Sequence, residues 1–208
     1  MNGTAHAAIG AASGFMVANT LNTDPTTTVF LVGLGGVSGL VPDLDIDGKL
    51  SGRITFSHRI IRTVAQLIGV MLIFYSYYEG IGTDQYVGMG IGLVITGMAS
   101  SIRQKHMLTT TGIGVMMGGY FLDETWIILM GLYIMLASLV AHRTYTHSIV
   151  GVLFYAVIVS QLEASLSING IFYTGLIGYI SHLVADSKML PFNRRGVKLF
   201  LPFSSTEF

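Results

Sequence analysis

A histidine and an aspartate lie four residues apart near the C-terminal end, in His182-Leu-Val-Ala-Asp186. On an α-helix this spacing places both side chains on one face, where they can bind one metal ion or form a histidine–carboxylate pair beside it. The alternative is a membrane helix that ends with two polar residues at the interface. Ionisable side chains at membrane depth are costly and usually functional, so the spacing favours a functional pair.

A second element, His142-Arg-Thr-Tyr-Thr-His147, holds two imidazoles five residues apart. This spacing is poor for one helix face, so we expect one histidine on a helix and the other in the loop before it, with Thr144 or Thr146 able to cap the helix. Arg143 is planar and permanently charged, which suits a phosphate or carboxylate group. Its alternative role is to mark the cytoplasmic side of the membrane by its charge.

A third element places aspartates at alternate positions, Asp43, Asp45 and Asp47, before Gly48. It begins like a calcium loop, but the twelfth position is Ile54 instead of a glutamate, which excludes an EF-hand. In an extended segment alternate side chains face the same way, and three like charges repel without a counter-ion. The sequence leaves two readings open, a cation site and a solvated loop.

The remaining histidines have weaker support. His6 has no chemical partner near it in the sequence, whereas His58 and His106 lie among basic residues. His58 follows the aspartates and ranks with Asp47 as a second-rank candidate. The chain has no cysteine, so His, Asp and Glu are the strong metal ligands it offers. A serine hydrolase is disfavoured because no Gly-x-Ser-x-Gly motif occurs.

The composition predicts a membrane protein. Of the 208 residues 51% are hydrophobic and 11% are charged, whereas a soluble domain has about 25% charged residues; the mean hydropathy is +0.65. We predict an all-α fold, a polytopic membrane bundle of about eight apolar helices that forms a single domain over residues 1–208. The apolar runs cover residues 7–20, 28–42, 63–78, 86–101, 107–122, 126–141, 148–162 and 170–185.

Positive charge alternates between the loops. All 11 Lys and Arg residues follow the second, fourth, sixth and last apolar runs, and the other separators have none. Because positive charge is retained inside, we predict a multi-pass protein of a bacterial-type inner membrane with both termini cytoplasmic and residues 79–84 external. All six histidines then fall on the cytoplasmic side. The 11 basic and 11 acidic residues balance, so no nucleic acid partner is expected.

The chain resembles the YdjM-like family of membrane-bound, metal-dependent hydrolases, and the resemblance spans nearly its whole length. Its motifs are His6, Pro42-Asp43-x-Asp45, His142-Arg143-x-x-Thr146-His147-Ser148 and Gly178-Tyr179-x-Ser181-His182-x-x-x-Asp186. The last motif is also similar, more distantly, to the helical zinc-dependent phospholipase C and nuclease fold. The resemblance implies a multi-span inner-membrane architecture and metal-dependent hydrolysis.

On this resemblance one or two divalent ions are expected, zinc first, with manganese or iron as alternatives. The expected ligands are His6, Asp43, Asp45, His147, His182 and Asp186. The ion would lower the pKa of a bound water to near ~7. His142 or an uncoordinated aspartate such as Asp45 would act as general acid or base, and Arg143 would stabilise negative charge on a phosphoryl group.

The expected substrate is an amphiphilic phosphoester, a phospholipid or an isoprenoid phosphate, that enters sideways from the bilayer. Membrane lipids are therefore the expected partners. Two other classes stay open. A divalent-cation transporter would carry ligands on both sides of the midplane, which the outer loops do not offer. A non-catalytic, metal-stabilised membrane scaffold would share the ligands of an enzyme and differ only in having no open coordination position.

Overall fold

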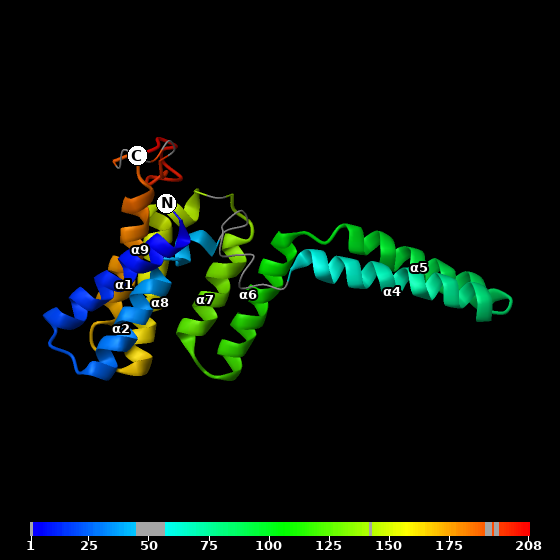
Figure 1. The fold of residues 1–208 in the computed structure, drawn as a ribbon, viewed down its shortest axis with the longest axis horizontal. Helices are drawn as coiled ribbons and strands as arrows, with labels where there is room; N and C mark the ends of the chain where they lie inside the picture. The colour runs from blue at the N-terminus through cyan, green and yellow to red at the C-terminus, as the bar shows by residue number, and fades with distance from the viewer. Residues whose placement is uncertain (1, 45–56, 142, 190–192, 194–195) are drawn as a thin grey trace. The chain divides into compact units, whose positions relative to one another are not determined.

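The chain is all-helical in the part that the computed structural model describes, residues 2–44, 57–141, 143–189, 193 and 196–208 (Figure 1). No strand occurs among these residues, which confirms the all-α class. Eight α-helices follow the eight predicted apolar runs in order. They are α1 (Gly3–Thr20), α2 (Pro25–Ser38), α4 (His58–Glu79), α5 (Thr83–Ser100), α6 (Gln104–Phe121), α7 (Thr125–Ala137), α8 (Ile149–Leu166) and α9 (Ile171–Asp186), with short 3-10 helices η1 (Val41–Leu44) and η2 (Tyr145–His147).

The chain divides into two compact units. One contains Met1–Ser51 and Leu108–Phe208, and the other contains Gly52–Met107. The predicted single domain over residues 1–208 stays a prediction. Every residue of the candidate site described below belongs to the first unit.

The second unit is built on a hairpin of α4 and α5, which lie side by side (Figure 1). Small and polar residues line the contact between the two helices: Gly69 lies against Thr96, and Gln66 Nε2 donates to Ser100 Oγ at 3.2 Å. Large apolar side chains point outward, including Phe74 (60% exposed) and Tyr78 (75% exposed). Polar groups inside and apolar groups outside are typical of helices surrounded by lipid.

Two helices are long and apolar enough to cross a membrane, α4 and α8, by length and composition. The pair α5 and α6 meets the same condition only when taken together as one broken span. Two or three candidate spans therefore occur among the described residues. The eight-span bundle and the cytoplasmic termini stay predictions.

In the first unit, glycines bring α1, α2 and α9 into backbone contact. A β-carbon on Gly35 would overlap the Gly10 carbonyl oxygen and lie 3.1 Å from the Gly14 nitrogen. A β-carbon on Gly178 of α9 would lie 2.8 Å from the Gly35 carbonyl oxygen. Only residues without a side chain allow such an approach. The contact holds the start of α1, the end of α2 and the second half of α9 together, and these segments carry the candidate site.

We predict that Gly35→Ala destabilises the first unit whereas Gly33→Ala does not. A β-carbon at Gly33 has no neighbour within 4 Å, so that variant should keep or gain stability, by up to about 1 kcal/mol from helix propensity. The clash at Gly35 should cost about 1–3 kcal/mol. Thermal unfolding of both variants in detergent measures the difference. Equal melting temperatures for the two variants would contradict the glycine contact.

Candidate metal centre

Five ionisable side chains from four separate segments meet in the first unit. His6 comes from α1, Asp43 from η1, His147 from η2, and His182 and Asp186 from α9. All five are buried, with exposed fractions between 0% and 7%. Burial of ionisable groups is costly unless each is paired or binds a cation, so the arrangement requires strong compensating interactions.

His182 is oriented by the backbone at the end of α2. Its Nδ1 lies 2.7 Å from the carbonyl oxygen of Gly39, the residue that caps α2. A carbonyl oxygen only accepts, so Nδ1 carries the hydrogen and Nε2 of the neutral ring carries the lone pair. A β-carbon on Gly39 would lie 2.6 Å from the His6 carbonyl oxygen, so glycine is what lets α1 pass over this cap.

The Nε2 atom of His182 faces two other candidate ligand atoms. His147 Nε2 lies at 3.3 Å and Asp43 Oδ1 at 3.7 Å, and these two atoms are 3.8 Å from each other. Ligands of a tetrahedral zinc ion with bonds of 2.0–2.2 Å are separated by about 3.3–3.6 Å. The triangle of two imidazole nitrogens and one carboxylate oxygen, with sides of 3.3, 3.7 and 3.8 Å, is therefore slightly wider than an occupied metal site and close to its size.

His147, the last residue of η2, is contacted at Nδ1, the ring nitrogen that faces away from His182. Its Nδ1 lies 3.1 Å from Thr146 Oγ1, and the Thr146 carbonyl accepts a hydrogen bond from the Tyr179 hydroxyl. The Tyr133 and Tyr179 hydroxyls are 3.0 Å apart, and Tyr155 stacks on Tyr179. Partners of this kind orient the ligands of metal sites.

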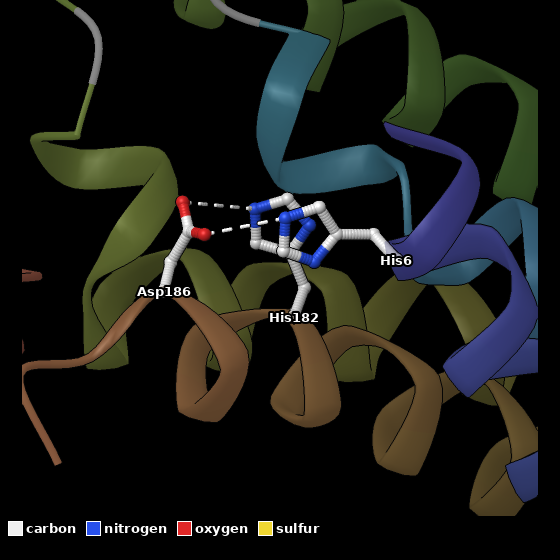
Figure 2. A group of neighbouring side chains, drawn as sticks. All are labelled: His6, His182 and Asp186. Carbon is white, nitrogen blue, oxygen red and sulfur yellow. Dashed lines mark ion pairs between the residues drawn. The ribbon is translucent and has the colours of Figure 1, made fainter. Parts of the chain in front are cut away.

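Asp186 lies beside His6 and His182 (Figure 2). Its Oδ1 lies 3.2 Å from His6 Nε2, and its Oδ2 lies 2.8 Å from an Arg143 nitrogen and 3.9 Å from His182 Nε2. The His6 ring stacks on the His182 ring at 3.9 Å. His6 Nδ1 is buried and has no hydrogen-bond partner among the described residues.

The charge state of Asp186 follows from these contacts. Asp186 lies at the end of α9, outside the two candidate spans. Burial alone would raise its pKa, but the hydrogen bond with His6 and the charge of Arg143 together hold the pKa well below its usual range. Asp186 is therefore a carboxylate in this arrangement and brings a negative charge to the centre.

The structure thus brings together five of the predicted ligands and places Arg143 beside them. Their roles as ligands stay predictions. Asp45, Asp47 and His142 lie outside the described residues. His58 belongs to the second unit, where its Nδ1 lies 2.8 Å from Gln104 Oε1.

Sequence reasoning missed three contributors, Gly39, Tyr133 and Tyr155. Gly39 acts through its backbone carbonyl, and every residue type has a backbone carbonyl, so the sequence gives no signal for it. The two tyrosines lie in apolar helices, where they are typical of packing.

Comparison with known protein families gives a match over the full length of the chain. The family model described as YdjM inner membrane protein matches residues 1–208. No curated protein and no solved structure matches the chain.

Proposed function

Because the chain belongs to the YdjM inner membrane protein family, we propose that it is a membrane-bound, metal-dependent hydrolase that acts on a phosphoester at the cytoplasmic face. The observation that carries the proposal is the buried triangle of His182 Nε2, His147 Nε2 and Asp43 Oδ1, with sides of 3.3, 3.7 and 3.8 Å. The Nε2 atom of His182, which carries the lone pair, lies close to a carboxylate oxygen and to a second imidazole nitrogen. A cation between them would compensate the buried carboxylate of Asp43.

The donor set fits a borderline divalent ion. Imidazole nitrogen and carboxylate oxygen suit zinc, and also manganese and iron, whereas calcium prefers a shell of oxygens. A divalent ion held there would polarise a phosphoryl oxygen and lower the pKa of a water that it coordinates. Asp43, His147 and His182 are the residues that would hold it.

Arg143 supports a phosphoryl group as the target. Its side chain is 26% exposed, whereas that of Asp186, its partner, is 4% exposed, so the guanidinium lies where the centre meets its surroundings. The Arg143 backbone has φ 60°, a left-handed conformation that costs a non-glycine residue about 1–3 kcal/mol and persists only where surrounding structure holds it. A planar guanidinium there suits the oxygens of a phosphate better than an acyl chain.

The neighbourhood of His147 supports an amphiphilic substrate. Helix α8, a candidate span, begins at Ile149, two residues after His147. Its first turns expose apolar side chains, among them Val150 (44%) and Leu153 (61%). A phospholipid or an isoprenoid phosphate in the adjacent leaflet could therefore reach the centre sideways, with membrane lipids as the partners of these apolar faces.

A divalent-cation transporter is the alternative from another class. In the described part of the chain, clusters of three or more candidate ligands occur only at this centre. A path across the membrane would need further ligands along it, so the arrangement favours hydrolysis. A non-catalytic, metal-stabilised scaffold would bind the same ion but would not hydrolyse a phosphoester.

We predict that His182→Ala abolishes both metal binding and phosphoester hydrolysis while the protein remains inserted in the membrane. The ring supplies a lone pair from the centre of the cluster, and no neighbouring side chain can replace it. Metal content and phosphate release from a panel of phosphoesters measure the two effects. Ser181→Ala is the matched control, because in the described part of the chain Ser181 Oγ donates to its own helix, at the Gly178 carbonyl. Full metal content and activity in His182→Ala would refute the proposed site.

We predict that Arg143→Lys keeps the metal but lowers turnover by about 100-fold, as loss of a donor to developing charge does. Lysine keeps the positive charge but not the planar fork. Metal content and the turnover number, measured on one preparation, separate the two steps. If the variant matches the parent, the planar fork of Arg143 has no role in turnover and its positive charge is sufficient.

We predict that a cysteine replacing Asp84 reacts with a membrane-impermeant thiol reagent in intact cells, whereas one replacing Thr206 reacts only after permeabilisation. Both positions are exposed, and the chain has no native cysteine to interfere. The opposite pattern would place the metal centre outside and contradict a cytoplasmic substrate.

A further inference from the structure

Two groups of candidate ligands occur in the centre, and they share one residue. His6, His182 and Asp186 form one group, and Asp43, His147 and His182 form the other, each with its ligand atoms within 4.8 Å of one another. Both groups use the same atom of His182, because its Nδ1 is occupied by the Gly39 carbonyl. An imidazole nitrogen has one lone pair and binds one ion. The two groups therefore cannot hold two ions at once.

Ring geometry argues against the group that contains His6. The lone pair of an imidazole nitrogen lies in the ring plane, so a bound ion must lie near the plane of every histidine that binds it. The rings of His6 and His182 are stacked, with centroids 3.9 Å apart and planes inclined by 22° (Figure 2). Planes with this separation and tilt meet roughly 8–10 Å away, whereas a zinc–nitrogen bond is about 2.0–2.1 Å long.

The same test favours the group that contains His147. Its ring and that of His182 have centroids 5.2 Å apart and planes inclined by 67°, with the two Nε2 atoms 3.3 Å apart. Two imidazoles on one tetrahedral ion with bonds of about 2.0–2.1 Å have centroids about 5 Å apart. His147 and His182 therefore have the spacing of two ligands of the same ion.

We infer that the centre binds a single divalent ion through Asp43, His147 and His182, and that His6 is a positioning residue and not a ligand. This inference rests on the proposed function and assigns the roles within its site. His6 packs flat on His182 and holds Asp186 through Nε2 at 3.2 Å. Arg143 holds the other oxygen of the same carboxylate at 2.8 Å.

His6 and Arg143 both bind the Asp186 carboxylate, and this double contact fixes its position. Asp186 Oδ2 lies 3.9 Å from His182 Nε2, and because its two oxygens already pair with His6 and Arg143 we assign Asp186 beside the ligand set and not within it. Three protein ligands leave a fourth position open, which is the pattern of catalytic sites, whereas closed sites are structural.

The test is a titration with Co²⁺ of the full chain in detergent, after removal of metal with a chelator. His6→Phe keeps a flat ring for stacking but has no nitrogen, and His147→Phe makes the same change on the other histidine. We expect one Co²⁺ per chain in the parent. We expect a dissociation constant about 10- to 100-fold weaker than that of the parent for His6→Phe, since outer partners of a metal site contribute that much, and a loss of more than about 100-fold for His147→Phe, which removes a ligand.

Circular dichroism and gel filtration establish that each variant is folded. If His147→Phe does not fold, Asp43→Asn, which keeps the side-chain shape, replaces it with the same expected loss. If His6→Phe does not fold, His6→Leu takes its place. Two ions per chain in the parent, or equal losses in the His6 and His147 variants, would overturn the ligand assignment and leave the proposed metal site standing. A parent that binds no Co²⁺ would overturn both.

Discussion

The hydrogen bond between His182 Nδ1 and the Gly39 carbonyl, at 2.7 Å, is the interaction on which the rest of the centre depends. It determines which nitrogen of His182 carries the proton and aims the other nitrogen at His147 and Asp43. The carbonyl is available because α2 ends there, where helix carbonyls have no partner within the helix. The glycine contacts among α1, α2 and α9 then bring this carbonyl and His182 into range. The orientation of His182 in the centre therefore depends on the backbone packing of α1, α2 and α9.

The centre concentrates charge in an environment that disfavours it. Asp43 and Asp186 are both buried, and two carboxylates near each other repel. Arg143 compensates the charge of Asp186 directly, at 2.8 Å. A cation bound in the triangle of Asp43, His147 and His182 would compensate the charge of Asp43. Removal of one partner from a buried charged cluster leaves the other uncompensated, which costs more than loss of a surface pair. Loss of any one charged residue of the cluster is therefore expected to destabilise the protein.

Helix class and the order of the apolar runs could be predicted from the sequence because hydrophobicity and length determine them. The spacing of His182 and Asp186 indicated a functional pair, and the family resemblance placed Asp43 and His147 in the same expected ligand set. What the sequence could not show was the stacking of His6 on His182, because ring orientation depends on how α1 crosses α9. The role of Gly39 was hidden for a related reason, since a backbone carbonyl is present at every residue. Membrane topology was inferred from loop charge, and among the residues that the structure describes only α4 and α8 individually have the length and composition of spans.

The central claim, that two imidazoles and a carboxylate hold a divalent ion, is tested most directly by X-ray absorption fine structure of the zinc-loaded full chain. The account predicts a first shell at about 2.0–2.2 Å with two imidazole nitrogens and a carboxylate oxygen, since His147, His182 and Asp43 lie within one bonding triangle. Outer-shell scattering from imidazole rings would identify the two histidines. A shell of oxygen atoms alone, without imidazole scattering, would contradict it.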